Sequence, residues 1–142
     1  MRFMIIRKAD ADTEAAAMPS AELFAAMGAY NEAMVNAGVM VSGEGLLPSS
    51  RGARIRFRDG QPAITDGPFA EAKELIAGFT IIQVASREEA LEWVKRWPAE
   101  DGNGNVELEL RRIAEAEDFG EAFTPELREQ EDRLRERLAE QR

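Results

Sequence analysis

The sequence contains neither cysteine nor histidine. This absence removes the side chains used in Ser-His-Asp triads, in thiolate nucleophiles, in histidine general acids, and in most zinc and haem sites. The chemistry that remains comes from carboxylates, lysines, arginines, backbone amides and a single tyrosine, Tyr30. We therefore expect neither a metal site nor a bound cofactor.

Two glycine-rich segments lack the residues that would complete a nucleotide site. Gly43-Glu44-Gly45 and Gly102-Asn103-Gly104 are not followed by the third glycine of a dinucleotide fingerprint or by a phosphate-loop lysine. The stretch from Asp101 to Asn105 also lacks the closing glutamate of a calcium loop, so it reads as a turn. These segments predict loops rather than ligand sites.

Long apolar runs and basic stripes are missing as well. The first apolar run, 3–6, is too short for a signal peptide, and no run approaches the roughly 20 residues of a membrane span. The net charge of −9 repels a phosphate backbone, and the arginines are interleaved with acids. We expect a cytoplasmic protein with neither a membrane nor a nucleic acid as partner.

The 142 residues, 44% of them hydrophobic and 32% charged, are typical of one globular domain. A chain of this length buries roughly two-thirds of its unfolded surface and needs no disulfide to hold a fold. The last part differs in composition, because residues 115–142 hold ten acids against five arginines. We expect a folded domain over 1–113 and an acidic extension over 114–142.

The pattern of the folded part is strand, helix, strand, inserted ribbon, strand, helix, strand. Ser20 and Gly38 are typical of the two ends of a helix, and Ser86 with Glu89 forms a capping box before a second helix. Two helices on one face of a mainly antiparallel sheet predict an α+β, ferredoxin-like fold. The expected segments are a strand at 2–8 buried on both faces, a loop at 9–19, a helix at 20–37, strands at 39–47 and 78–85, a helix at 86–97 and a strand at 106–111.

Two features predict surfaces that need a partner. A sheet with both helices on one face leaves its other face uncovered, so we expect a twofold homodimer with sheet faces apposed. In the extension, a helix is expected from about Thr124, with a thin stripe formed by Leu127, Leu134 and Leu138. A stripe this narrow rarely stabilises an isolated helix, so we expect the helix to dock or to fray.

The ribbon carries the first candidate ligand-binding residues. Ala53, Ile55 and Phe57 alternate with arginines, and Asp59-Gly60 is a strong hairpin signal. Arg54 and Arg56 share one face and can hold a small anion by bidentate hydrogen bonds. The alternative is that this row is simply the solvated face of a hairpin.

Glu44 is a further candidate, because it lies between two strand glycines. Glycines inside a strand indicate a bulge or a place where another group approaches the backbone closely. The Glu44 carboxylate can face a pocket there. The alternative is a bulge with a solvated carboxylate.

Thr65 to Glu74 is the densest cluster of turn-forming and charged residues. Asp66-Gly67-Pro68 predicts a rigid turn in which glycine permits positive φ and the Asp66 side chain bonds the following amides. Asp66 is the candidate catalytic residue, as a general base or substrate anchor near Lys73, which is a candidate ligand-binding residue. The alternative is an aspartate that only caps its own turn.

This segment resembles the Asp-Gly-Pro-Phe signature of the YCII-related family, and the resemblance extends over roughly residues 1–113. It includes Gly43-Glu44-Gly45-Leu46, Gly78-Phe79 and Pro98. The resemblance implies a ferredoxin-like dimer of the dimeric α/β barrel type, but no settled activity. The His-Asp pair of the wider group cannot be carried over, because the histidine is missing. For some members the resemblance also implies an association with extracytoplasmic-function sigma factors.

Two functional hypotheses follow. The first is a dimeric protein that binds a small molecule or a partner, with a regulatory role linked to an extracytoplasmic-function sigma factor. The second is a cofactor-independent lyase or isomerase that acts on a small anionic or aromatic compound. In that case Asp66 is the base, and Arg54 and Arg56 hold the anion.

Overall fold

A computed structural model describes residues 1–142 of the chain. Its main sheet has four antiparallel strands in the order β2-β5-β1-β6, and β3 and β4 form a separate two-stranded ribbon. The elements are β1 (Arg2–Lys8), α1 (Ala11–Glu14), α2 (Ala21–Asn36), β2 (Met40–Gly45), β3 (Ala53–Arg58), β4 (Gln61–Asp66), β5 (Ile76–Gln83), α3 (Arg87–Val94), β6 (Leu108–Arg112) and α4 (Pro125–Glu140), with short 3₁₀ turns η1 (Ser49–Arg51), η2 (Ala72–Glu74), η3 (Asp101–Gly104) and η4 (Ala116–Asp118).

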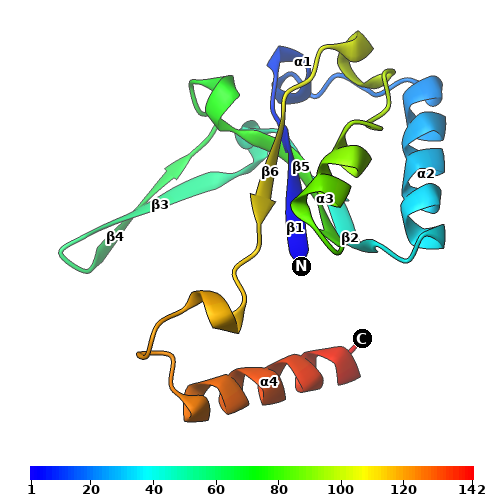
Figure 1. The fold of residues 1–142 in the computed structure, drawn as a ribbon. Helices are drawn as coiled ribbons and strands as arrows, with labels where there is room; N and C mark the ends of the chain where they lie inside the picture. The colour runs from blue at the N-terminus through cyan, green and yellow to red at the C-terminus, as the bar shows by residue number, and fades with distance from the viewer. The chain divides into compact units, whose positions relative to one another are not determined.

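The order of elements confirms the α+β, ferredoxin-like prediction. Two split units, β1-α2-β2 and β5-α3-β6, interleave so that β1 lies between β5 and β6. Figure 1 shows α2 and α3 on the same side of the sheet. One face of the sheet is therefore covered by helices, and the other is not.

The hydrophobic core lies between the sheet and these two helices. Phe3 and Ile5 of β1 pack with Ile82 of β5, Met34 of α2 and Ala90 of α3. Each is at most 2% exposed, and full burial of one large apolar side chain stabilises the fold by about 1.5–3 kcal/mol. The prediction that β1 is buried on both faces is wrong, because alternate residues of β1 are only half-buried.

The half-buried residues of β1 belong to the face away from the helices, which we call the open face. Met4 pairs with Ile81 of β5, and Ile6 pairs with Phe79. These four side chains form a half-buried apolar strip across the two central strands. Polar residues flank the strip in the neighbouring strands: Ser42, Glu44, Glu109 and Arg111.

The predicted helix ends are confirmed for α2. The Ser20 hydroxyl accepts a hydrogen bond from the Leu23 amide at 3.1 Å, and Gly38 follows the helix with a φ of +73°. At α3 the Ser86 hydroxyl accepts from the Glu89 amide as expected. The Glu89 carboxylate, however, accepts from the amide of Ala85 instead of that of Ser86.

The prediction of a loop over 9–19 is wrong in part, because this stretch contains helix α1. The Asp10 carboxylate accepts from the Thr13 amide at 2.8 Å, and the Thr13 hydroxyl accepts from the Asp10 amide at the same distance. This reciprocal cap satisfies two backbone donors and stabilises a single helical turn. A four-residue helix has no apolar periodicity, so only the cap could have revealed it.

Of the two roles predicted for the strand glycines, a bulge or a close approach, Gly43 shows the close approach. The bulge of β2 lies between Met40 and Ser42, before the glycines. A side chain at Gly43 would meet Met40 at 3.1 Å, and one at Gly78 in β5 would meet the Glu44 carbonyl oxygen at 3.0 Å. These glycines therefore permit close approach between neighbouring groups.

The β3–β4 ribbon forms as the sequence predicts. Six residue pairs join the strands, and Asp59 and Gly60 form the turn with φ values of +50° and +77°. Arg54, Arg56 and Arg58 lie on one face of the ribbon. In Figure 1 the ribbon extends away from α2 and α3.

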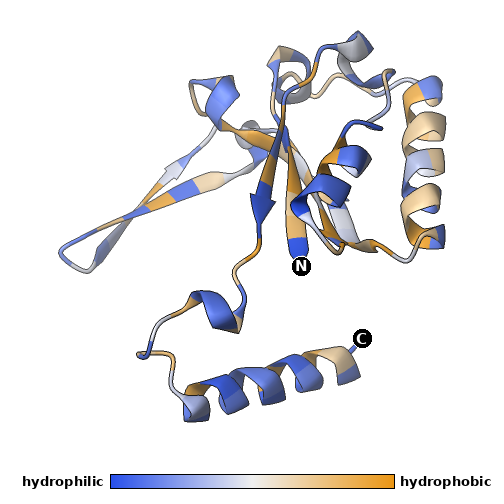
Figure 2. Cartoon of the chain, viewed as in Figure 1, coloured by the Kyte–Doolittle hydropathy of each residue, from blue (hydrophilic) through white to orange (hydrophobic).

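The chain divides into two compact units, Met1–Arg112 and Ile113–Arg142. The second unit contains α4. This helix begins after Thr124, whose hydroxyl accepts from the Leu127 amide, which confirms the predicted start. Figure 2 shows α4 mostly in hydrophilic colours. None of the helices has the length and apolar character needed to cross a membrane.

Candidate functional site

A groove of about 900 Å³ lies along the ribbon, and it is the candidate binding site. Its lining includes three arginines and no acidic residue, in a chain whose net charge is −9. Because a two-stranded ribbon twists strongly, residues from both of its faces reach the groove. The lining residues are Arg54, Ile55, Arg56, Phe57, Arg58, Gln61, Pro62, Ala63, Thr65 and Phe69.

Phe69 joins the signature segment to the ribbon. The Arg54 guanidinium lies over the Phe69 ring, 4.1 Å from its centroid. A cation over an aromatic face is held by the ring quadrupole, and this contact contributes about 0.5–1 kcal/mol at an exposed site. Arg54 is thus oriented by the ring, whereas Arg56 and Arg58 are exposed along the same face.

The backbone around Phe69 is fixed by a neighbouring turn. The Phe69 amide donates to the Ser49 hydroxyl at 3.0 Å, and the Gly67 amide donates to the Gly52 carbonyl at 3.0 Å. The Gly67–Pro68 peptide is cis. The predicted bonds from Asp66 to the amides that follow it are therefore wrong, because those amides have other acceptors and Pro68 has no amide hydrogen.

Gly67 is required for a reason that the sequence did not indicate. Its φ is not positive, contrary to the prediction. A β-carbon at this position would lie 1.8 Å from the Ser49 carbonyl oxygen. The turn that carries Phe69 can reach η1 only because residue 67 has no side chain.

Ser49 is also bound by Glu14 of helix α1. The Ser49 amide donates to one carboxylate oxygen of Glu14 at 3.0 Å, and the Ser49 hydroxyl donates to the other. One serine hydroxyl thus joins Glu14 to the Phe69 amide. The groove is therefore tied to the body of the protein through α1.

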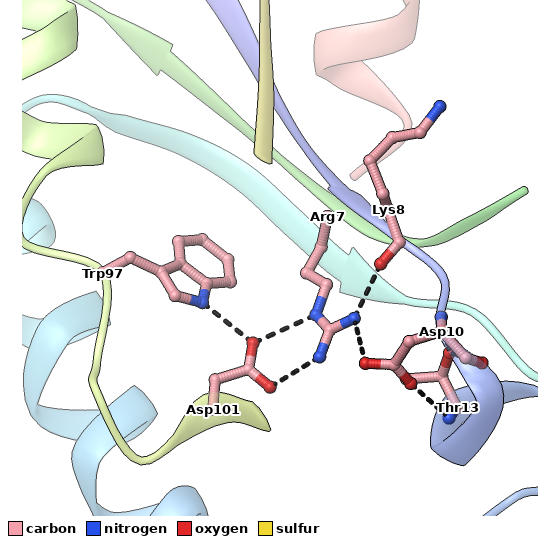
Figure 3. A network of polar contacts seen from close by, with 6 residues as sticks. All are labelled: Arg7, Lys8, Asp10, Thr13, Trp97 and Asp101. Carbon is pink, nitrogen blue, oxygen red and sulfur yellow. Dashed lines mark hydrogen bonds and ion pairs between the residues drawn. The ribbon is translucent and has the colours of Figure 1, made fainter. Parts of the chain in front are cut away.

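Helix α1 is in turn anchored by a buried ion pair between Arg7 and Asp101. Figure 3 shows the Arg7 guanidinium between the two aspartates, Asp101 and Asp10. Arg7 donates to the Asp101 carboxylate at 2.8 and 3.1 Å, and to Asp10 at 3.0 Å. The Trp97 indole donates to Asp101 at 2.8 Å, and the Lys8 carbonyl accepts from Arg7 at 2.6 Å. Arg7 and Asp101 are each 8% exposed.

The electrostatics of this cluster favour its charged forms. Burial raises the pKa of Asp101, but the hydrogen bonds from Arg7 and Trp97 outweigh it and leave that pKa below its ordinary 3.8. The Thr13 amide lowers the pKa of Asp10, and the Asp101 hydrogen bond raises the pKa of Arg7. The three groups are therefore all ionised at neutral pH.

Tyr30 of α2 lies in the core. Its hydroxyl donates to the Trp93 carbonyl at 2.7 Å. Burial raises the pKa of the phenol to about 12. A phenol that is buried, bonded and protonated at neutral pH is not a candidate acid–base group.

The structure brings together only part of the set of candidate residues. Arg54 and Arg56 both line the groove. Asp66 ends β4 opposite Ala53, exposed and outside the groove lining. Glu44 is exposed on the open face of the sheet, where it pairs with Phe79, and Lys73 is exposed in η2.

Sequence reasoning missed the residues that hold the groove in place. Arg7 could have been found, because it falls on the inward-facing alternation of an apolar strand, and a charge there needs a partner. Glu14 and Ser49 carry no comparable signal. No cluster of three or more acidic side chains is placed to hold a metal ion.

The family model for the YCII-related domain matches residues 1–122. Uncharacterized protein R00369 of Rhizobium meliloti (strain 1021) is 36% identical over 69 residues, which are 49% of this chain and 56% of that protein. The match thus spans little more than half the length of that relative.

The structure is also similar to that of 5-chloro-2-hydroxyhydroquinone dehydrochlorinase (TftG) from Burkholderia phenoliruptrix AC1100, in complex with 2,5-dihydroxybenzoquinone. The TM-score is 0.48, with 18% identity over 84% of this chain and 100% of that chain. The family assignment rests on the domain match, which covers most of the sequence. This chain belongs to the YCII-related family.

Proposed function

We propose that the protein binds small anions with a planar apolar body in the ribbon groove. The observation that supports this proposal is the lining, which combines three arginines with apolar side chains and holds no acid. Guanidinium groups bind carboxylates by paired charge-assisted hydrogen bonds. Pro62 and Phe69 offer apolar surface to the rest of such a ligand.

The first experiment compares benzoate with benzamide, which has nearly the same shape and no charge. We expect benzoate to bind and benzamide to bind at least about tenfold more weakly, because a hydrogen bond to a charged group contributes about 1.5–3 kcal/mol. Arg56→Ala should weaken benzoate binding by a similar factor, whereas Arg87→Ala, an exposed arginine at the start of α3, should leave it unchanged. Titration followed by NMR chemical shifts measures all four affinities. Equal binding of the two compounds, or no effect of Arg56→Ala, would remove the basis of the proposal.

The protein is further proposed to be a homodimer that buries the open face of its sheet. Met4, Ile6, Phe79 and Ile81 form an apolar strip there that the helices of the same chain do not cover. Burial of apolar surface drives the association of subunits, and identical chains most often pair about a twofold axis. Sedimentation should give twice the chain mass, and Ile6→Asp should give a folded monomer. A wild-type monomer at high protein concentration would contradict this.

The remaining hypotheses stay predictions. The lyase or isomerase alternative needs Asp66 as a base, and this residue lies outside the groove lining. Its test is whether Asp66→Asn abolishes turnover without changing the melting temperature. The Asp-Gly-Pro-Phe subgroup, the cytoplasmic location and the sigma-factor association also stay predictions. Co-purification with a co-expressed sigma factor tests the association.

A further inference from the structure

The β3–β4 ribbon combines complete exposure with an apolar face. Every residue of the two strands is exposed. Ile55 pairs with Ile64, and Phe57 pairs with Pro62, on the face opposite the three arginines. Ile55, Phe57 and Ile64 are 54%, 67% and 71% exposed.

A ribbon of this kind needs support from another surface. Isolated two-stranded hairpins are at best marginally stable in water and gain stability from further strands or from packing. The outer edges of β3 and β4 are both unpaired within the chain, and unpaired edges and apolar patches are sites of association. The ribbon is therefore built to contact something that the single chain does not supply.

Charge indicates which partner fits. Residues 51–66 hold four arginines and two aspartates, a net charge of +2. Because the whole chain carries −9, the other 126 residues carry −11. A second copy of this chain is therefore acidic overall, and its net charge favours approach to the basic ribbon. Over a few ångströms this attraction acts with little screening by salt.

The position of the ribbon agrees with the same partner. In Figure 1 the ribbon extends away from α2 and α3, which cover the face of the sheet opposite to the open face. A second copy seated on the open face would therefore lie on the side toward which the ribbon extends. The ribbon thus extends on the same side of the sheet as the dimer surface proposed above.

We propose that the ribbon is an arm that packs its apolar face, formed by Ile55, Phe57 and Ile64, onto a second copy of this chain. The proposal rests on the homodimer of the proposed function and adds a second contact to it. Burial of these side chains removes the exposed apolar surface of the ribbon. Dimer formation would then order the ribbon that lines the groove.

Ile64→Asp is the sharpest variant, because Ile64 lies outside the groove lining. The matched control is Val35→Asp on α2, where the replaced residue is 60% exposed and the added charge is the same. Sedimentation equilibrium should show the dimer dissociation constant of Ile64→Asp raised about tenfold or more, as for a central interface residue, and that of Val35→Asp within about twofold of wild type. Both variants should keep the wild-type melting temperature of the monomer.

Hydrogen exchange supplies an independent measurement on the wild-type chain. Amides of 53–66 should exchange more slowly above the dimer dissociation constant than below it, because docking stabilises the ribbon. Equal dimer dissociation constants for Ile64→Asp and Val35→Asp, or equal exchange rates of the ribbon amides in monomer and dimer, would contradict the proposed arm. Neither result would contradict the dimer formed through the sheet. A wild-type chain that never dimerises would overturn both proposals.

Discussion

Single residues decide how the groove is held in place. The Arg7–Asp101 pair joins strand β1 to the turn after α3, and the partners are 94 positions apart in the sequence. The Arg7 and Asp101 side chains are only 9% and 11% exposed, so water cannot replace the hydrogen bonds that one gives to the other. Each buried charge therefore depends on its partner. Asp10 then uses one oxygen for Arg7 and the other for the cap of α1.

Asp101→Asn should destabilise the protein by about 1.5–3 kcal/mol, because it removes the buried counter-ion of Arg7 and leaves only the ion pair with the more exposed Asp10. Urea unfolding measures the loss. Glu92→Gln is the control, because the Glu92–Lys95 pair is exposed at 72% and 68%. That change should cost within about 0.5 kcal/mol. A loss in Asp101→Asn no larger than in the control would contradict the role of the buried pair.

At the scale of elements, the turn that follows β4 and the turn η1 fit together through one close backbone contact. Gly67 lies against the carbonyl of Ser49, and Ser49 is held by α1. The aromatic ring that stacks on Arg54 follows two residues later. The order of the groove therefore depends on a segment outside the ribbon.

Gly67→Ala should destabilise the protein by about 1–3 kcal/mol, because the new β-carbon overlaps a backbone oxygen that cannot easily move. Gly52→Ala is the matched control, since its β-carbon would lie 3.6 Å from the same oxygen, an ordinary contact. Thermal unfolding compares the two variants. The Phe69 amide should also lose its hydrogen-exchange protection only in Gly67→Ala. Equal melting temperatures would show that the turn can shift without cost.

At the scale of the whole molecule, the lowered pKa values of Asp101 and Asp10 predict how stability depends on pH. A carboxylate whose pKa is lower in the folded than in the unfolded state contributes stability above its unfolded value, here 3.8. That contribution is lost as the pH falls through the lower folded value. Both aspartates therefore stabilise the protein at neutral pH and stop doing so in acid.

The difference in stability between wild type and Asp101→Asn should accordingly be largest at neutral pH and shrink below pH 3.8. The reason is that the protonated aspartic acid carries no charge, like asparagine. Urea midpoints between pH 7 and 3 measure this difference. A gap that stays constant over that range would show that the charge of Asp101 is not what stabilises the fold.

The predictable part of the structure had local signals. Ser20 and Gly38 marked α2, and Asp59-Gly60 with alternating arginines marked the ribbon. Of the candidate site, Arg54 and Arg56 were placed correctly on one face. Asp66 was given hydrogen bonds that Ser49 and Gly52 accept instead, because its turn packs against a segment that no local pattern identifies.

The sequence by itself determined the strands, the two core helices and the family, because caps, turns and apolar periodicity act over a few neighbouring residues. The tertiary structure alone decided that Arg7 meets Asp101, that Gly67 meets Ser49, and that Asp66 lies outside the groove. These contacts join segments far apart in the chain. Their partners are selected by packing of the whole fold. The residues next to them in the sequence therefore show no pattern that identifies these partners.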